Sequence, residues 1–428
     1  RYGDIADAAA ERSLPTAVFL KEPDEFVLLG KPMPRLDTPE KVDGSAIFGS
    51  DIQLPGLYTA VVARSPLLGG QVKKFKSRKA LAIKGVKKVV QISSGVAVIA
   101  EHFWAAKKGL DALSITWDEG PNKDLDSASI FASFATALNE NKDITASENG
   151  DAAQVLSSAA KSIEAIYTVP YQAHVCMEPM NATADVRTDG CDIYVGTQGQ
   201  TAAQKTAMQL TGLPEEKVKV HTTYLGGGFG RRGEQDFIID AVECSQAMGA
   251  PVKVVWTREE DVRNGQYRPA TYNALRGGVD ANGKIVAWQH RIAGPSILAR
   301  RFPNAVSSGL DNTSLEGASN IPYDFANRQV SYAMVNPPVP VGFWRSVGSS
   351  QNAYVTECFF DELAALAGRD PLVARLQLLE NHPRHAGVLQ LAAEKADWGK
   401  PPPAGRARGI AVAEAFASWA AQVAEVSI

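Results

Sequence analysis

The stretch of the sequence with the clearest potential for chemistry is a glycine-rich run, Leu225-Gly226-Gly227-Gly228-Phe229-Gly230-Arg231-Arg232-Gly233. It follows an alternating, strand-like segment (217–224) and precedes a segment with helical apolar spacing (235–248). Glycines between a strand and a helix let backbone N–H groups approach an anionic or polar ligand closely, and the positive end of the helix dipole adds to the attraction. The run therefore predicts a binding loop for a large cofactor.

The same run leaves a second function open. Gly228, Gly230 and Gly233 match the G-x-G-x-x-G fingerprint of dinucleotide-binding proteins, so an NAD(P)-binding oxidoreductase that uses Gly228–Gly233 is an alternative. Against it, the next unit reads as an antiparallel hairpin, and no acidic residue ends a convincing next parallel strand. A tight turn that packs the helix on the strand would explain one or two glycines, but hardly all five.

Cysteine and histidine spacing predicts no metal bound by side chains. The four cysteines (Cys176, Cys191, Cys244 and Cys358) lie far apart and form no C-x-x-C pair. Cys244 and Cys358 fall inside helical patterns, which favours packed thiols. Only His382 and His385 stand three apart, and Pro383 between them indicates a loop or a helix start.

Composition limits the classes of partner. The chain has 428 residues and a net charge of −3, from 44 basic and 47 acidic residues that read as mixed along the sequence. Such mixing forms no cluster of basic residues that could bind nucleic acid, and it favours a small-molecule substrate. Hydrophobic residues make up 45% of the chain, and no long apolar run or signal peptide is visible.

The pattern of elements predicts an α+β fold in several parts. Residues 1–30 read as a short alanine-rich helix and an extended connector, and 31–120 as a compact domain with strands at 57–64, 86–91, 96–100 and 114–117 and a helix at 103–113. Residues 121–149 are polar around one weak helix, which predicts an exposed connection between domains.

Residues 150–428 predict a second, larger domain. Its strands are expected at 163–169, 182–186, 192–195, 217–224 and 252–256, and its helices at 201–210, 235–248 and, last, 352–366. Asn282-Gly283 between two apolar segments predicts an antiparallel hairpin. Residues 421–428 alternate as a strand does and end on Ile428, so we expect the chain to continue elsewhere.

Several motifs in a fixed order resemble the molybdenum-cofactor-binding large subunit of the xanthine dehydrogenase and aldehyde oxidase superfamily. The glycine run is similar to its G-G-G-F-G motif, and the ending Arg231-Arg232 resembles the isoquinoline 1-oxidoreductase branch. The other matching motifs are Arg35-Leu36-Asp37 with Lys41-Val42, His174-x-x-Met177-Glu178-Pro179, Thr197-Gln198, Trp256-Thr257-Arg258, Tyr267-Arg268-Pro269 and Gly342-Phe343-Trp344-Arg345-Ser346-Val347-Gly348.

The resemblance implies a site without metal ligands from the protein, because in this family the pterin dithiolene holds the molybdenum. Gln198 would donate a hydrogen bond to an oxygen ligand of the metal, and the backbone of Gly227, Gly228, Phe229 and Gly230 would contact the cofactor. Arg345 would bring its guanidinium group to polar atoms of the cofactor or the substrate. Two of these roles have ordinary alternatives: Gln198 could cap the helix at 201–210, and Arg345 could pair with a structural carboxylate.

A substrate pocket and a fold also follow from the resemblance. Trp344 and Val347 would line the pocket, although an aromatic side chain beside a buried loop is as often part of the core. Residues 31–120 would form an α/β hammerhead domain, and residues 150–428 the first part of the molybdopterin-binding domain. The expected reaction is hydroxylation of an N-heteroaromatic compound or an aldehyde, with an oxygen derived from water.

The family's glutamate general base, in a G-V-G-E-type motif, has no counterpart in this sequence, so the catalytic residue is expected outside this chain. Glu234 stands one residue past the family's substrate-contacting acid, and Gly233 occupies that position here. A non-catalytic fragment or scaffold is therefore a third hypothesis.

The resemblance implies partners and a location as well. The expected partners are the remaining part of the large subunit, a small [2Fe–2S] subunit and a cytochrome c, and the expected cofactor is the cytosine dinucleotide form of molybdopterin. Members of the branch are exported to the periplasm or lie peripheral to the inner membrane, and we expect the same location here.

Overall fold

The computed structural model of the chain describes residues 1–427. Two compact units are present: the first is Arg1–Ile47, and the second begins at Phe48. The first unit holds the 3-10 turns η1 (Tyr2–Ile5) and η2 (Pro23–Glu25) and the helices α1 (Ala6–Ala10) and α2 (Thr38–Asp43). Helix α1 lies in the alanine-rich stretch for which a short helix is predicted, and almost all side chains of this unit are exposed.

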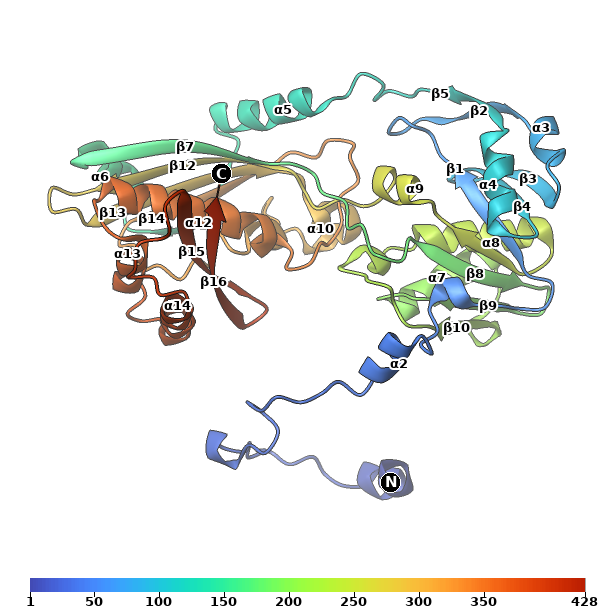
Figure 1. The fold of residues 1–428 in the computed structure, drawn as a ribbon, viewed down its shortest axis with the longest axis horizontal. Helices are drawn as coiled ribbons and strands as arrows, with labels where there is room; N and C mark the ends of the chain where they lie inside the picture. The colour runs from blue at the N-terminus through green and yellow to red at the C-terminus, as the bar shows by residue number, and fades with distance from the viewer. Residues whose placement is uncertain (428) are drawn as a thin grey trace. The chain divides into compact units, whose positions relative to one another are not determined.

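A seven-stranded sheet in the second unit carries the elements around the glycine run (Figure 1). In sheet order the strands are β10 (Val218–Thr222), β9 (Cys191–Val195), β8 (Asn181–Val186), β11 (Val252–Val255), β1 (Tyr58–Ala63), β4 (Gly95–Ala100) and β3 (Val86–Ile92). Strand β1 pairs in parallel with β11, with Tyr58 opposite Val252. Strands from the two ranges predicted as separate domains, 31–120 and 150–428, therefore share one sheet.

Helices pack on this sheet as the apolar spacing predicts. Helix α8 (Asp236–Met248) packs on β8 and β11, and α4 (Phe103–Asp111) packs on β1 and β4. Phe237, Ala241 and Cys244 of α8 are fully buried in the core that the helix shares with the sheet. Helix α7 (Gln200–Thr211) lies against α8 and β10. The start of α8 and the end of β10 therefore hold the two ends of the glycine run.

A five-stranded sheet forms the second core. Its order is β6 (Ile144–Asn149), β14 (Arg328–Met334), β13 (Ile285–Gly294), β12 (Thr271–Val279) and β7 (Lys161–Val169). Strands β12 and β13 form the predicted hairpin, and Gly283 in its turn has φ 75°. Helix α12 (Gly348–Leu366) covers β12 and β7, and its side chains Phe359, Phe360 and Leu363 pack with Trp288.

Residues 121–149 differ from the exposed connection that their polar composition predicts. They contain α5 (Ser127–Asn139), which buries Ile130, Phe134, Ala137 and Leu138. They also contain β6, which pairs with β14 as an edge strand of the five-stranded sheet. Four apolar side chains at helical spacing bury enough area to fix this helix on the sheet, and the polar residues around them form its exposed face.

The C-terminal part has more elements than the sequence suggests. The predicted helix at 352–366 is α12, but α13 (Pro371–Gln377), α14 (Pro383–Lys395), β15 (Arg406–Ala415) and β16 (Ser418–Ser427) follow it. Strand β16 confirms the strand predicted at 421–428 as far as Ser427, and Ile428 lies outside the described residues; β16 pairs with β15. The remaining elements are the helices α3 (Arg78–Leu81), α6 (Ala152–Ser158), α9 (Arg258–Arg263), α10 (Ile297–Arg301) and α11 (Asn312–Leu315), and the paired strands β2 (Gln71–Lys76) and β5 (Ser114–Asp118). The mixture of sheets and packed helices confirms the α+β class.

Candidate functional site

The glycine run forms an irregular loop between β10 and α8. Gly227 and Gly230 have φ angles of 94° and 105°, and Phe229 has φ 55°. Left-handed backbone is unfavourable for residues with a side chain, so Phe229 keeps this conformation only because its surroundings impose it. Residues 225–230 of the loop are partly or fully exposed.

Three consecutive backbone donors of the loop have no acceptor. The N–H of Gly226 donates to Glu178 Oε2, and the N–H of Gly230 donates to Gln198 Oε1, each at 3.0 Å. Between them, the N–H groups of residues 227–229 donate to no acceptor within residues 1–427. Polar backbone groups in folded proteins are satisfied by protein, water or ligand, so this row of donors suits an electron-rich ligand.

Several glycines of the loop, among them Gly228 and Gly230, stand closer to neighbouring atoms than a side chain would allow without a shift. A Cβ atom on Gly228 would lie 2.6 Å from Gln198 Oε1, and one on Gly230 would lie 1.9 Å from the carbonyl oxygen of Phe343. Gly228 is thus pressed against Gln198, and Gly230 is pressed against the loop that carries Arg345. The structure therefore brings together the glycine loop, Gln198 and the loop at 342–348.

The side-chain NH₂ group of Gln198 has no partner within the described residues. Its Oε1 is occupied by the N–H of Gly230, while its Nε2 donates to no partner within the described residues. The side chain is exposed, and it does not cap α7, whose N-cap is Gly199 without a side-chain bond. The helix-capping role is therefore not the one that Gln198 has here.

The two arginines of the run are structural. The Arg232 side chain is fully buried, and it donates to the carbonyl oxygens of Gly227 and Gly196 and to the carboxylate of Glu178 at 2.7 Å. Arg231 forms two hydrogen bonds of 2.8 Å with Asp236 at the start of α8. A guanidinium group can bind several oxygens at fixed angles, so these two buried side chains stabilise the conformation of the loop.

The loop at 342–348 contains the other predicted residues. Arg345 is exposed, and within residues 1–427 it makes no side-chain hydrogen bond or ion pair, so it does not pair with a structural carboxylate. Trp344 is partly buried, and its Nε1 is a buried donor without an acceptor in the described chain. Val347 is partly buried and has φ 46°, an unfavourable angle for a β-branched residue. Strain of this kind is typical of functional loops.

Carboxylates near the loop are already engaged. Glu234 is buried and forms ion pairs with Arg300 at 2.5 Å and Arg301 at 2.8 Å. It is therefore held by two cations and is not a free acid or base. Within residues 1–427, no group of three His, Cys, Asp or Glu side chains could hold a metal ion, and the four cysteines are free.

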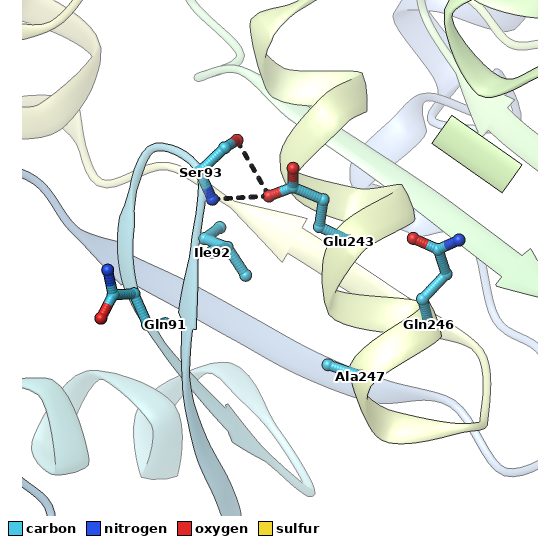
Figure 2. Close-up of a pocket in the computed structure, with 6 residues that line it drawn as sticks. All are labelled: Gln91, Ile92, Ser93, Glu243, Gln246 and Ala247. Carbon is cyan, nitrogen blue, oxygen red and sulfur yellow. Dashed lines mark hydrogen bonds between the residues drawn. The ribbon is translucent and has the colours of Figure 1, made fainter. Parts of the chain in front are cut away.

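A shallow hollow of about 700 Å³ lies elsewhere on the sheet (Figure 2). It is lined by Gln91, Ile92, Ser93, Glu243, Gln246 and Ala247. Glu243 accepts hydrogen bonds from the backbone N–H and the hydroxyl of Ser93, at 2.8 and 2.9 Å. None of the predicted site residues lines this hollow, so it carries no part of the predicted chemistry.

Two side chains that contact the loops of the site are not singled out by the sequence, although both stand in a motif. Glu178 binds the N–H of Gly226 and the guanidinium of Arg232, and His174 Nε2 lies 2.8 Å from the carbonyl oxygen of Phe343. Both belong to His174-x-x-Met177-Glu178-Pro179. Their role could have been suggested only by the place of this motif among the ordered motifs that the chain shares with the resembling family.

Comparisons with known proteins agree with this geometry. Residues 137–379 match the family described as a molybdopterin cofactor-binding domain. The chain is 31% identical over 99% of its length to the beta chain of the isoquinoline 1-oxidoreductase of Brevundimonas diminuta, and spans 55% of that protein. It is 28% identical over 96% of its length to one of the nicotinate dehydrogenase subunits of Pseudomonas putida, and spans 37% of that protein.

A solved structure has the same fold. The aldehyde oxidoreductase of Desulfovibrio desulfuricans superposes with a TM-score of 0.70 over 90% of this chain and 49% of that protein, at 17% identity. The chain thus spans about half the length of this protein and of the isoquinoline relative.

Proposed function

Because this chain belongs to the molybdopterin cofactor-binding family, we propose that it is part of the large subunit of a molybdenum hydroxylase. The observation that carries the proposal is the row of unpaired N–H groups at residues 227–229 next to the free amide of Gln198. These donors are consecutive in a loop whose backbone approaches Gln198 and Phe343 closely at Gly228 and Gly230.

The residues present fit a molybdopterin cofactor. The N–H groups of Gly227, Gly228 and Phe229 would donate to electron-rich atoms of the pterin and its phosphate, and Gln198 Nε2 would donate to an oxygen ligand of the metal. Arg345, which has no protein partner in the described chain, would donate to polar atoms of the cofactor or the substrate. The bound cofactor would supply the two-electron chemistry of hydroxylation with oxygen from water.

The substrate class we propose is an N-heteroaromatic compound hydroxylated beside its nitrogen. The relative with 31% identity carries isoquinoline in its name and one with 28% carries nicotinate, which supports a heterocycle; another with 28% is named an aldehyde dehydrogenase, so an aldehyde is the alternative substrate. Trp344 and Val347 would line the pocket, because both lie in the loop that meets the glycine loop.

Other features of the assembly are part of the same proposal. Residues 31–120 would correspond to the hammerhead domain, and the cofactor would be the cytosine dinucleotide form. Electrons would pass to a small [2Fe–2S] subunit and then to a cytochrome c, in the periplasm or at the inner membrane. The rest of the large subunit would supply the glutamate base.

The test is the metal and nucleotide content of the native assembly. The proposal predicts stoichiometric molybdenum by mass spectrometry and release of cytidine monophosphate from the extracted cofactor. A fully folded native complex without molybdenum would overturn it. Full cofactor without turnover on any heteroaromatic or aldehyde would instead favour a non-catalytic scaffold.

The nicotinamide alternative finds little support in the topology. Strands β10 and β11, which flank α8, are parallel, but β9 and β8 lie between them, whereas the dinucleotide fold has neighbouring strands. Trp256 follows β11, where the fold places an acidic residue for the ribose. Fluorescence titration with NADH and NADPH tests this alternative, and we expect no saturable binding.

A further inference from the structure

His174 connects its own segment to the loop at 342–348. Its Nε2 lies 2.8 Å from the carbonyl oxygen of Phe343, which is 169 positions away in the sequence. The residue is 9% exposed, and its Nδ1 is buried without a partner in the described chain. Burial lowers the pKa of the imidazole below its usual value, so the ring is neutral at neutral pH. A neutral ring has one N–H, and the carbonyl acceptor assigns it to Nε2.

The carbonyl of Phe343 lies close to two other segments. His174 donates to it, and the backbone of Gly230 is so close that a Cβ atom on Gly230 would lie 1.9 Å from the oxygen. Within residues 1–427, the bond from His174 is the only hydrogen bond that another segment makes to residues 343–345. Without it, the hydrogen bonds that remain to these three residues within the described chain are those of the loop's own turns, and Phe343 and Trp344 keep only ring contacts with Phe302 and Arg268.

The backbone conformation of the rest of the loop is intrinsically unfavourable. Ser346 and Val347 have φ angles of 61° and 46°. At the far end, Gly348 begins α12 so close to the carbonyl of Thr313 that a Cβ atom would lie 2.3 Å from that oxygen. Two consecutive residues with left-handed φ need external constraints. The loop has such constraints at Phe343 and at Gly348, on either side of Arg345.

Several side chains in the segments that hold His174 and Trp344, and at residues 266–268, have buried polar atoms without a partner within residues 1–427. Tyr171 Oη, Gln266 Oε1, Arg268 Nε and Trp344 Nε1 are all buried atoms without a hydrogen-bond partner in the described chain. The guanidinium carbon of Arg268 lies 5.8 Å from the centre of the Trp344 ring, and the His174 ring centre lies 6.4 Å from it. None of these side chains replaces the bond from His174 to the loop.

We propose that His174 is a positioning residue, whose N–H holds the Phe343 carbonyl against Gly230 and thereby keeps Trp344 and Arg345 beside the glycine loop. The consequence for catalysis rests on the proposed function. The consequence for the loop does not, because it follows from contacts within this chain. His174 acts through the loop and does not contact the cofactor or the substrate itself.

The position of the loop can be read without any turnover. Arg345 is the exposed residue of the loop, so cleavage by trypsin after Arg345 reports how often the loop leaves its place. Arg12 in the first unit is also exposed, and cleavage after it provides an internal reference. The substrate of the assay is the complete subunit in its native assembly, and mass spectrometry follows both new peptide ends.

Three substitutions separate the hydrogen bond from the shape of the ring. His174→Gln keeps a donor near the position of Nε2, His174→Asn places its donor near Nδ1, and His174→Leu has none. We expect His174→Leu and His174→Asn to raise the rate of cleavage at Arg345 relative to Arg12 about fivefold to tenfold, the effect of one lost hydrogen bond on local opening. We expect His174→Gln to stay within about twofold of the native rate.

Equal cleavage in all three variants would overturn the proposal. Should His174→Leu fail to fold, the comparison of His174→Gln with His174→Asn still decides, because their side chains differ in where they place the donor. His221→Leu, at an exposed position on β10, is the matched control and should leave cleavage at Arg345 unchanged.

Activity and molybdenum content separate this proposal from the proposed function. If the native protein contains molybdenum and turns over substrate, kcat/KM should fall in His174→Leu and be largely restored in His174→Gln, with molybdenum content unchanged. If the native protein has neither metal nor turnover but cleavage at Arg345 responds as expected, the proposed function fails and the role of His174 stands. If turnover is normal and cleavage does not respond, the role of His174 is refuted.

Discussion

The backbone N–H of Gly230 donates to the side-chain oxygen of Gln198 at 3.0 Å, 32 positions away in the sequence. Because the amide oxygen is engaged by the loop, the NH₂ group of Gln198 is the part that remains for a ligand. One side chain thus fixes the glycine loop and offers a donor beside the row of N–H groups at residues 227–229. Gln198 therefore links the shape of the loop to the binding of a ligand.

Gln198→Glu should separate these two roles. A carboxylate still accepts from Gly230, but its second oxygen cannot donate to an oxygen ligand of a metal. We expect folding stability to be preserved and kcat to fall about a hundredfold, the usual effect of losing one donor in an active site. Thermal unfolding and steady-state kinetics of the assembly measure the two effects. Unchanged kcat with full molybdenum content would show that Gln198 does not donate to the reacting centre.

Gly230→Ala should disturb the loop more than a positive φ alone explains. The new Cβ would meet the carbonyl of Phe343 at 1.9 Å, whereas Gly212 has φ 70° and no atom within 4 Å of the corresponding position. We expect Gly230→Ala to cost at least about 2 kcal/mol of unfolding free energy, and Gly212→Ala about 1 kcal/mol. Urea denaturation measures both, and molybdenum content should fall only in Gly230→Ala. Equal costs for the two variants would contradict the close contact.

Arg232→Lys should show that the buried fork supports the loop. Lysine cannot reach Gly227, Gly196 and Glu178 together, so buried oxygens lose their donors. We expect a loss of about 2–4 kcal/mol of unfolding free energy. The control is Arg187→Lys in an exposed ion-pair cluster with Asp185 and Asp192, where we expect less than about 1 kcal/mol. A loss as small as that of the control would mean that the fork is dispensable.

Stability should fall as the pH drops below the usual pKa of histidine, partly because of His290. This side chain is fully buried and donates to Asn273 Oδ1 at 2.9 Å, and burial lowers its pKa to about 3. Between the unfolded pKa of about 6.5 and this value, the unfolded chain binds a proton that the folded chain does not, so unfolding becomes easier by about 1 kcal/mol per pH unit. His290→Gln keeps the donor and should flatten this slope between pH 6 and 4. Parallel slopes for the two proteins would contradict it.

Much of the site could be predicted from the sequence because its signals are local. Alternation over 217–224 and helical spacing over 235–248 fix β10 and α8, and they place the glycines between a strand end and a helix start. The placement of Gln198 and of the loop at 342–348 depends on the order of motifs. The structure brings both to the glycine loop.

The contact between Gly230 and Phe343 could not be predicted, because its partner is a backbone carbonyl, which every residue type has. The same holds for the donor to that carbonyl, since His174 and Phe343 are 169 positions apart. Strand β14 is not predicted because Arg328 and Gln329 begin it with polar side chains, and its burial depends on neighbours on both edges. Burial of α5 is not predicted because polar residues surround its short apolar stripe.

Strand β1 cannot form its parallel pairing with β11, in which Tyr58 lies opposite Val252, until the ribosome has synthesised β11. A ribosome adds about 5–20 residues per second, so roughly ten seconds or more pass between the emergence of β1 and that of β11. Throughout this interval the nascent chain exposes an unpaired, apolar strand edge, which is a hazard for association with other chains. When residues 31–120 are expressed alone, β1 lacks its partner β11 and keeps this edge unpaired. We expect such a product to be captured by chaperones or to be insoluble.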